Sequence, residues 1–193
     1  KKIHNFDNEL KAVEEKTDII LSDKQKEAIK AINDNNVCII TGGPGTGKTT
    51  IIKLVIKLFK NEGMSLALAA PTGRAAKRIT ETTGEEAKTI HRLLELGKLD
   101  DDNISIDYDV THIDKDVVIV DEMSMVDIVL MNYLMKGLED NTKLILIGDS
   151  DQLPSVGPGS VLKDLIESYC LVTKKLTEIY RQAAESQIVS NAS

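Results

Sequence analysis

Short apolar runs alternate with amphipathic stretches along most of the chain. Four runs are apolar at every position, and they lie at residues 37–40, 66–70, 117–120 and 144–147. Each is followed by a stretch whose apolar residues recur at helical spacing, at 49–60, 74–80, 126–138 and 161–168. A further run at 171–176 predicts a fifth strand. Strands that are apolar on both faces and alternate with helices predict an α/β fold, with a doubly wound, mostly parallel sheet covered by helices on both faces.

The length of 193 residues fits one domain with a short appendage. We expect a lead-in helix or linker over 1–20, one domain over 21–182, and the start of a further, truncated segment over 183–193. The chain opens on two lysines without an initiator Met and closes within a pattern, so we expect an excised fragment.

Negative charge is concentrated in one part of the chain. The whole chain carries 24 basic and 31 acidic residues, a net charge of −7, yet residues 81–116 hold 11 of the acids and only 4 of the bases. The remainder is therefore electrically balanced. We expect the stretch 99–116 to form an acidic insertion or hairpin on the surface. Its aspartates fit a solvated face better than a metal site, and the metal site stays open as the alternative.

Hydropathy and cysteine usage limit the class of protein further. No apolar run approaches the roughly 20 residues needed to cross a bilayer, so we expect no membrane association. Cys38 and Cys170 are not spaced as metal ligands and are predicted to be reduced thiols of the core or its edge, which favours the cytoplasm.

A glycine-rich segment joins the first predicted strand to the first long amphipathic stretch. Residues 42–49 read GGPGTGKT and match G-x-x-x-x-G-K-[ST] in the required strand-to-helix context. Glycines let backbone N–H groups cradle phosphates, the lysine reaches the β- and γ-phosphates, and the threonine hydroxyl ligates Mg²⁺. The residues expected to contact ATP here are Gly43, Pro44, Gly45, Thr46, Gly47, Lys48, Thr49 and Thr50.

An acidic pair follows the apolar run 117–120. We expect Asp121 and Glu122 to lie at the carboxyl edge of the sheet, on a strand neighbouring that of the phosphate loop. Asp121 would hold Mg²⁺ through water, whereas Glu122 would orient and deprotonate an attacking water. Alone, the pair would suggest only a polar turn; with the phosphate loop it indicates an NTPase rather than a kinase.

Five further segments, in order, resemble the motifs of a known family. They are residues 22–25 (SDKQ), 70–78 (APTGRAAKR), 89–94 (TIHRLL), 146–154 (LIGDSDQLP) and 176–182 (LTEIYRQ). With the phosphate loop and the acidic pair, they resemble the first RecA-like motor domain of superfamily 1 DNA helicases, in particular the RecD-like enzymes related to the exonuclease V alpha subunit.

The resemblance implies a RecA-like fold, ATP and Mg²⁺ as ligands, and 5′-to-3′ movement of the parent protein on single-stranded DNA. It also implies a second RecA-like domain in the same parent chain, and subunits of a nuclease complex as possible partners. Because a helicase of this family needs both domains, the fragment alone should bind nucleotide but unwind nothing.

Several residues take their expected roles from this resemblance. Gln25 would recognise the adenine edge, although 22–25 also reads as a helix capping box, and the two roles are compatible. Gln152 would sense the γ-phosphate, and Arg181 would neutralise charge that develops on it. Tyr180 would stack on adenine or pack in the core.

The expected contacts to DNA come from three segments. Arg74, Lys77 and Arg78 share one helix face by their spacing, which suits either phosphate binding or an ordinary solvated face. The residues expected at the DNA channel are Pro71, Thr72, Arg74, His91, Arg92 and Val156. Two other functions stay open, namely a different P-loop ATPase and a nucleotide-gated interaction module without turnover.

Overall fold

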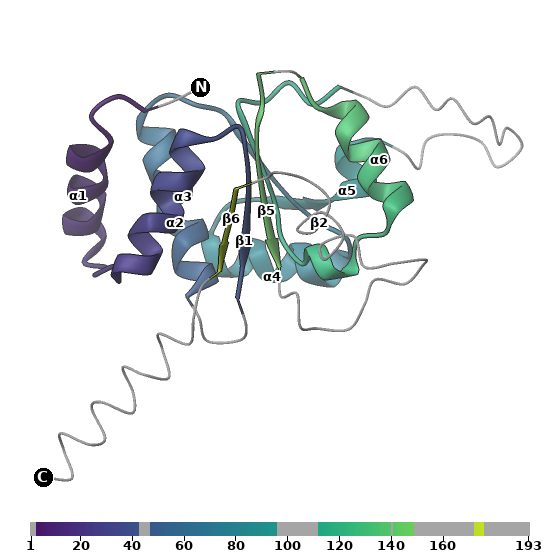
Figure 1. Ribbon diagram of the computed structural model, residues 1–193. Helices are drawn as coiled ribbons and strands as arrows, with labels where there is room; N and C mark the ends of the chain where they lie inside the picture. Colours follow the sequence, from purple (N-terminus) through teal and green to yellow (C-terminus); the bar gives the residue numbers. More distant parts are fainter. Residues whose placement is uncertain (1–2, 43–46, 96–111, 140, 149–171, 176–193) are drawn as a thin grey trace, which may run out of the picture.

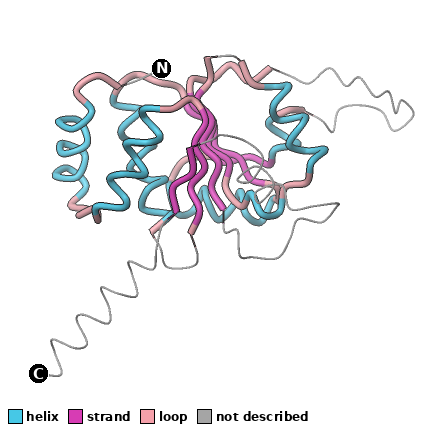
Figure 2. The backbone as a smooth tube through the Cα atoms, in the orientation of Figure 1, coloured by secondary structure: helices cyan, strands magenta, loops and turns pink. Residues whose placement is uncertain are grey.

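A six-stranded, all-parallel sheet forms the middle layer of the protein (Figures 1 and 2). The computed structural model describes residues 3–42, 47–95, 112–139 and 141–148, together with the backbone of 172–175. The strand order is β3-β2-β4-β5-β1-β6. The strands are β1 Val37–Thr41, β2 Leu66–Ala70, β3 Ala87–Thr89, β4 Val117–Val120, β5 Lys143–Gly148 and β6 Val172–Lys175.

Helices cover both faces of this sheet, as the sequence predicts (Figure 2). One face packs against α2 (Asp23–Asp34), α3 (Lys48–Asn61) and α4 (Gly73–Thr83), and α1 (Phe6–Thr17) packs outside them against α3 (Figure 1). The other packs against α5 (Ile90–Leu93), the 3₁₀ turn η2 (Met123–Met125) and α6 (Ile128–Gly137). Among the described residues, no helix is both long enough and apolar enough to cross a membrane.

Alternate residues of the strands enter opposite cores. In β4, Val117 and Ile119 join the core beneath α1–α4, whereas Val118 and Val120 join the core beneath α5 and α6. All four side chains are buried because successive side chains of a strand point to opposite faces. This double burial is why the runs are apolar at every position.

The structure corrects two expectations about the sheet. The strand of the acidic pair, β4, does not neighbour the strand of the phosphate loop, because β5 pairs with both and lies between them. The sequence analysis also missed β3, a three-residue edge strand with two partly buried residues and one exposed residue, whose apolar signal is accordingly weak. The predicted helix at 161–168 and most of the acidic stretch 99–116 lie outside the described residues.

A buried lysine joins α2 to β5. Lys143 is 1% exposed, and its Nζ donates hydrogen bonds to the carbonyl oxygens of Ile32 (2.6 Å), Asn33 (3.1 Å) and Asn35 (2.6 Å). These carbonyls lie in the last turn of α2 and just beyond it, where the helix itself supplies no donors. A positive charge also interacts favourably with the negative end of a helix dipole. Lys143 therefore fixes α2 against the sheet.

Replacing Lys143 by Met should destabilise the protein by about 1–3 kcal/mol, because it leaves two buried carbonyl oxygens and one partly buried carbonyl oxygen without their donor. The measurement is the free energy of unfolding in urea. Lys136→Met, at an exposed position of α6, is the control and should stay within about 0.5 kcal/mol of the wild type. Equal stability of the two variants would show that the Lys143 contacts contribute little.

Candidate nucleotide-binding site

The phosphate loop ends at a glycine whose backbone conformation favours glycine and which lies against the Gln25 side chain. Gly47 precedes α3 with φ 87° and ψ 18°, in the left-handed region that favours glycine. A Cβ atom built on Gly47 would lie 2.2 Å from Nε2 of Gln25. The backbone of this turn thus packs directly against α2. Of the predicted loop residues, Gly47, Lys48, Thr49 and Thr50 are described, whereas residues 43–46 lie outside the described part.

Gln25 forms the predicted capping box at the start of α2. The Ser22 N–H donates to Oε1 of Gln25 (3.0 Å), and the Gln25 N–H donates to Oγ of Ser22 (3.2 Å). The side chain is 8% exposed, and its Nε2 is the atom beside Gly47. The capping role is confirmed. Adenine recognition by Gln25 stays a prediction, and the cap holds this amide against the phosphate loop.

The acidic pair lies directly after β4, at the carboxyl edge of the sheet. The Asp121 N–H donates to the Ala69 carbonyl of β2 (3.0 Å), and Oδ1 of Asp121 accepts from the Glu122 N–H (2.8 Å). Glu122 has φ 58° and ψ 42°, a left-handed conformation that is strained in a residue other than glycine. The two carboxyl groups are thus held on a sharply turned backbone.

Burial raises the pKa of Asp121 above its usual value of 3.8, and the neighbouring Glu122 carboxylate adds to the rise. The hydrogen bond from the Glu122 N–H and the charges of Lys48 and Arg78 oppose it. Lys48, in the first turn of α3, is therefore close enough to act electrostatically on the end of β4. A divalent cation would relieve the same unfavourable charge burial.

One small cavity joins the two predicted halves of the site. It measures about 50 Å³ and is lined by Thr49 of α3 together with Asp121 and Glu122. Because β5 separates β1 from β4, the ends of those strands are about 10 Å apart at ordinary strand spacing. A hydroxyl and a carboxylate across such a gap suit Mg²⁺, which prefers few protein oxygens and completes its shell with phosphate and water. Within the described ranges, no group of three or more His, Cys, Asp and Glu side chains could hold a metal ion.

Arg78 of α4 lines the same cavity, which the sequence analysis did not foresee. Its Nη1 lies 3.8 Å from Oε1 of Glu122. The spacing with Arg74 and Lys77 suggested only a basic helix face. The pairing of β2 with β4 brings α4, which follows β2, beside the end of β4. The contact between Arg78 and Glu122 could be predicted only from the strand order, because β2 and β4 are neighbours in the sheet but not in the sequence.

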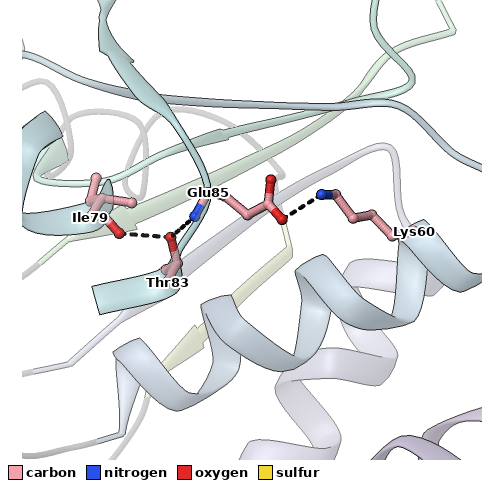
Figure 3. Close-up of polar contacts among 4 residues, drawn as sticks. All are labelled: Lys60, Ile79, Thr83 and Glu85. Atoms are coloured by element: carbon pink, nitrogen blue, oxygen red, sulfur yellow. Dashed lines mark hydrogen bonds and ion pairs between the residues drawn. The ribbon is translucent and has the colours of Figure 1, made fainter. Parts of the chain in front are cut away.

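Polar contacts also tie α4 to α3 (Figure 3). Lys60, near the end of α3, forms an ion pair with Glu85, which follows α4. The Glu85 N–H donates to Oγ1 of Thr83 (3.2 Å), whose hydroxyl donates to the Ile79 carbonyl (2.7 Å). The two helices that carry Thr49 and Arg78 are thereby connected.

The described DNA-channel candidates follow two adjacent strands. Thr72 caps α4, its Oγ1 accepting from the Ala75 N–H (3.2 Å), and Arg74 in the first turn is exposed. His91 and Arg92 are exposed on the short helix α5. Since β2 and β3 pair in parallel, both segments emerge at the same edge of the sheet.

The structure thus brings many of the predicted residues together at the carboxyl edge of the sheet. Other predicted residues lie outside the described residues. Pro71 is partly buried between β2 and the cap of α4. The candidates Gln152, Val156, Tyr180 and Arg181 lie outside the described residues, so their expected roles stay predictions.

Residues 25–158 match the family described as the AAA domain. The chain belongs to the AAA domain family. The match extends from the capping glutamine through the phosphate loop and the acidic pair, so it includes every described element of the candidate site.

Relatives of this AAA domain include helicase proteins. The chain is 38% identical over 175 residues to the ATP-dependent RecD2 DNA helicase of Deinococcus radiodurans, covering 89% of this chain and 23% of that protein. It is 36% identical over 169 residues to the RecBCD enzyme subunit RecD of Mycolicibacterium smegmatis, covering 75% of this chain and 30% of that protein. The chain therefore spans less than a third of these relatives. Their names confirm the resemblance to RecD-like helicases.

The fold of this AAA domain is shared with a solved helicase structure. The Pif1 helicase of Candida albicans superposes with a TM-score of 0.62 at 24% identity, over 89% of this chain and 43% of that one. At that identity the likeness concerns the fold alone, and it confirms the predicted RecA-like α/β class.

Gly47→Ala should lower the free energy of unfolding by about 1 kcal/mol more than Gly84→Ala. Both glycines have positive φ, 87° and 76°, but nothing lies within 4 Å of a Cβ on Gly84. Only the first variant therefore forces Gln25 out of its capping box, an interaction of about 1 kcal/mol. Urea unfolding of both variants makes the comparison. Equal losses of unfolding free energy in the two variants would mean that the Gln25 side chain moves away from residue 47 at no cost in stability.

Asp121→Asn should stabilise the nucleotide-free protein at neutral pH. Because the pKa of Asp121 is raised in the folded state, burial of its ionised carboxylate lowers the free energy of unfolding of the wild type. This loss is absent below pH of about 4, where the carboxyl group is protonated in both states, and it is complete once the pH has risen through the folded-state pKa. The gain in Tm over the wild type should therefore be largest near pH 7–8 and vanish toward pH 4. Thermal melts without Mg²⁺ measure it, with the exposed Asp114→Asn as control. A variant less stable than the wild type at pH 7 would contradict the expectation.

Proposed function

We propose that this chain is the ATP-binding motor domain of an ATP-dependent 5′-to-3′ DNA helicase. The observation that carries the proposal is the cavity shared by Thr49, Asp121 and Glu122, with Lys48 in electrostatic reach of Asp121. The names of the relatives, ATP-dependent RecD2 DNA helicase and RecBCD enzyme subunit RecD, support the helicase activity. The direction of movement rests on the family resemblance.

In the proposed site, each residue has one task. Lys48 binds the β- and γ-phosphates of ATP, and Gln25 contacts the adenine. Thr49 and Asp121 supply the protein ligands of Mg²⁺, directly and through water, respectively; when bound, the ion neutralises charge on the phosphate oxygens. Glu122 orients the attacking water and accepts its proton. Gln152 and Arg181 respond to the γ-phosphate, as the family pattern implies.

The proposed DNA path follows the starts of α4 and α5. Thr72 and Arg74 are suited to phosphate oxygens at a helix N-terminus, and His91 and Arg92 lie after the adjacent strand. Contacts of this kind carry no sequence preference. We infer that a second RecA-like domain of the whole protein completes the channel, so this domain alone binds nucleotide without unwinding. The subunits of a nuclease complex are the partners that we propose for the whole protein.

Glu122→Gln should reduce ATP hydrolysis by the intact protein about 10²-fold or more, because the amide cannot accept the proton of the attacking water. Binding of an ATP analogue should stay within about threefold of the wild type, whereas Lys48→Ala should lose it. Titration of the analogue with and without Mg²⁺, then hydrolysis with and without a single-stranded oligonucleotide, measures these quantities. Glu15→Gln, at an exposed position of α1, is the control.

The same experiment separates the alternatives. Hydrolysis that persists in Glu122→Gln would contradict the assigned role of that residue, and absence of any turnover in the wild type would favour a nucleotide-gated interaction module. Turnover that ignores single-stranded DNA would favour a different P-loop ATPase.

A further inference from the structure

We propose that Arg78 is a positioning residue that holds Glu122 back from the attacking water until single-stranded DNA draws the guanidinium away. The proposal rests on the proposed function, since it assigns a control on the hydrolysis step of that same site. It adds a residue that the motif pattern does not place at the nucleotide.

The contact itself is direct but weak. Arg78 and Glu122 approach to 3.8 Å and line the cavity that also contains Thr49 and Asp121. The Arg78 side chain is 67% exposed and that of Glu122 28% exposed. An ion pair in such a wet setting biases the paired over the unpaired state by at most about fivefold. It is therefore strong enough to slow a reaction and weak enough to be exchanged.

The backbone of Glu122 is fixed, so the ion pair acts on the side chain. The Glu122 N–H donates to Oδ1 of Asp121 (2.8 Å), and its carbonyl accepts from the Met125 N–H (3.0 Å). Both peptide groups beside the left-handed residue are thus occupied. The freedom that remains to Glu122 lies in its side-chain torsions, which are those that the guanidinium restrains.

The competing ligand would bind on the same helix. Arg74 and Arg78 are four residues apart, so their side chains are neighbours on the surface of α4, about 6 Å apart at Cβ. A phosphodiester held by Thr72 and Arg74 would lie within reach of Arg78, and guanidinium groups bind phosphate oxygens in a bidentate manner. Occupancy of the DNA path would thereby free Glu122.

Steady-state ATP hydrolysis by the intact protein tests the proposal, measured without DNA and at saturating single-stranded oligonucleotide. In Arg78→Ala and Arg78→Gln, the DNA-free kcat should rise about two- to fivefold. The KM for ATP and the DNA-saturated kcat should both stay within about twofold of the wild type, so the stimulation ratio falls. Arg78→Lys, which keeps the charge, should restore most of the wild-type ratio.

Two controls make the outcome specific. Lys88→Ala removes a positive charge from an exposed position outside the site and should leave the DNA-free rate unchanged. In the Glu122→Gln background, Arg78→Ala should produce no gain. A DNA-free rate that is unchanged or lowered in both neutral Arg78 variants would overturn the restraint, while DNA-stimulated hydrolysis by the wild type would leave the proposed function standing. A wild type that does not hydrolyse ATP, or ignores DNA, would overturn both.

Discussion

The burial of both faces of a parallel sheet is the constraint on which the rest of this structure depends. Parallel strands require a crossover between each pair, and the helices of these crossovers cover the apolar faces. Every strand therefore ends at the same edge. The phosphate loop after β1, the cap of α4 after β2, and the acidic pair after β4 meet there although they are far apart in the sequence.

This edge concentrates features that cost stability. Asp121 is a carboxylate with a pKa raised by burial, and Glu122 adopts a left-handed backbone conformation that is strained in a residue other than glycine. Features of this kind persist where the surroundings over-determine them, and they gather at functional sites. Here the strand pairing of β4 with β2 and β5, and the packing of Gln25 against the loop, provide the support.

The repeating apolar runs predict most of the fold. The runs at 37–40, 66–70, 117–120 and 144–147 form β1, β2, β4 and β5. A strand that is buried on both faces requires apolar residues at successive positions, and these runs have them. The phosphate-loop signature predicted the start of α3 and the roles of Lys48 and Thr49, since its glycines and its lysine have fixed chemical tasks. The edge strand β3 was not predicted, because three residues without a buried member generate no periodicity.

Local sequence by itself determined every described strand except β3 and β6's exact bounds, the turn chemistry at Gly47 and the capping box of Gln25, because each depends on neighbours within a few positions. It also determined the types of residue that the site contains. Only the tertiary structure decided that β5 separates β1 from β4, that Lys143 anchors the end of α2, and that Arg78 contacts Glu122. These three arrangements depend on strand order. Strand order follows from how whole faces pack together, and no local pattern records it.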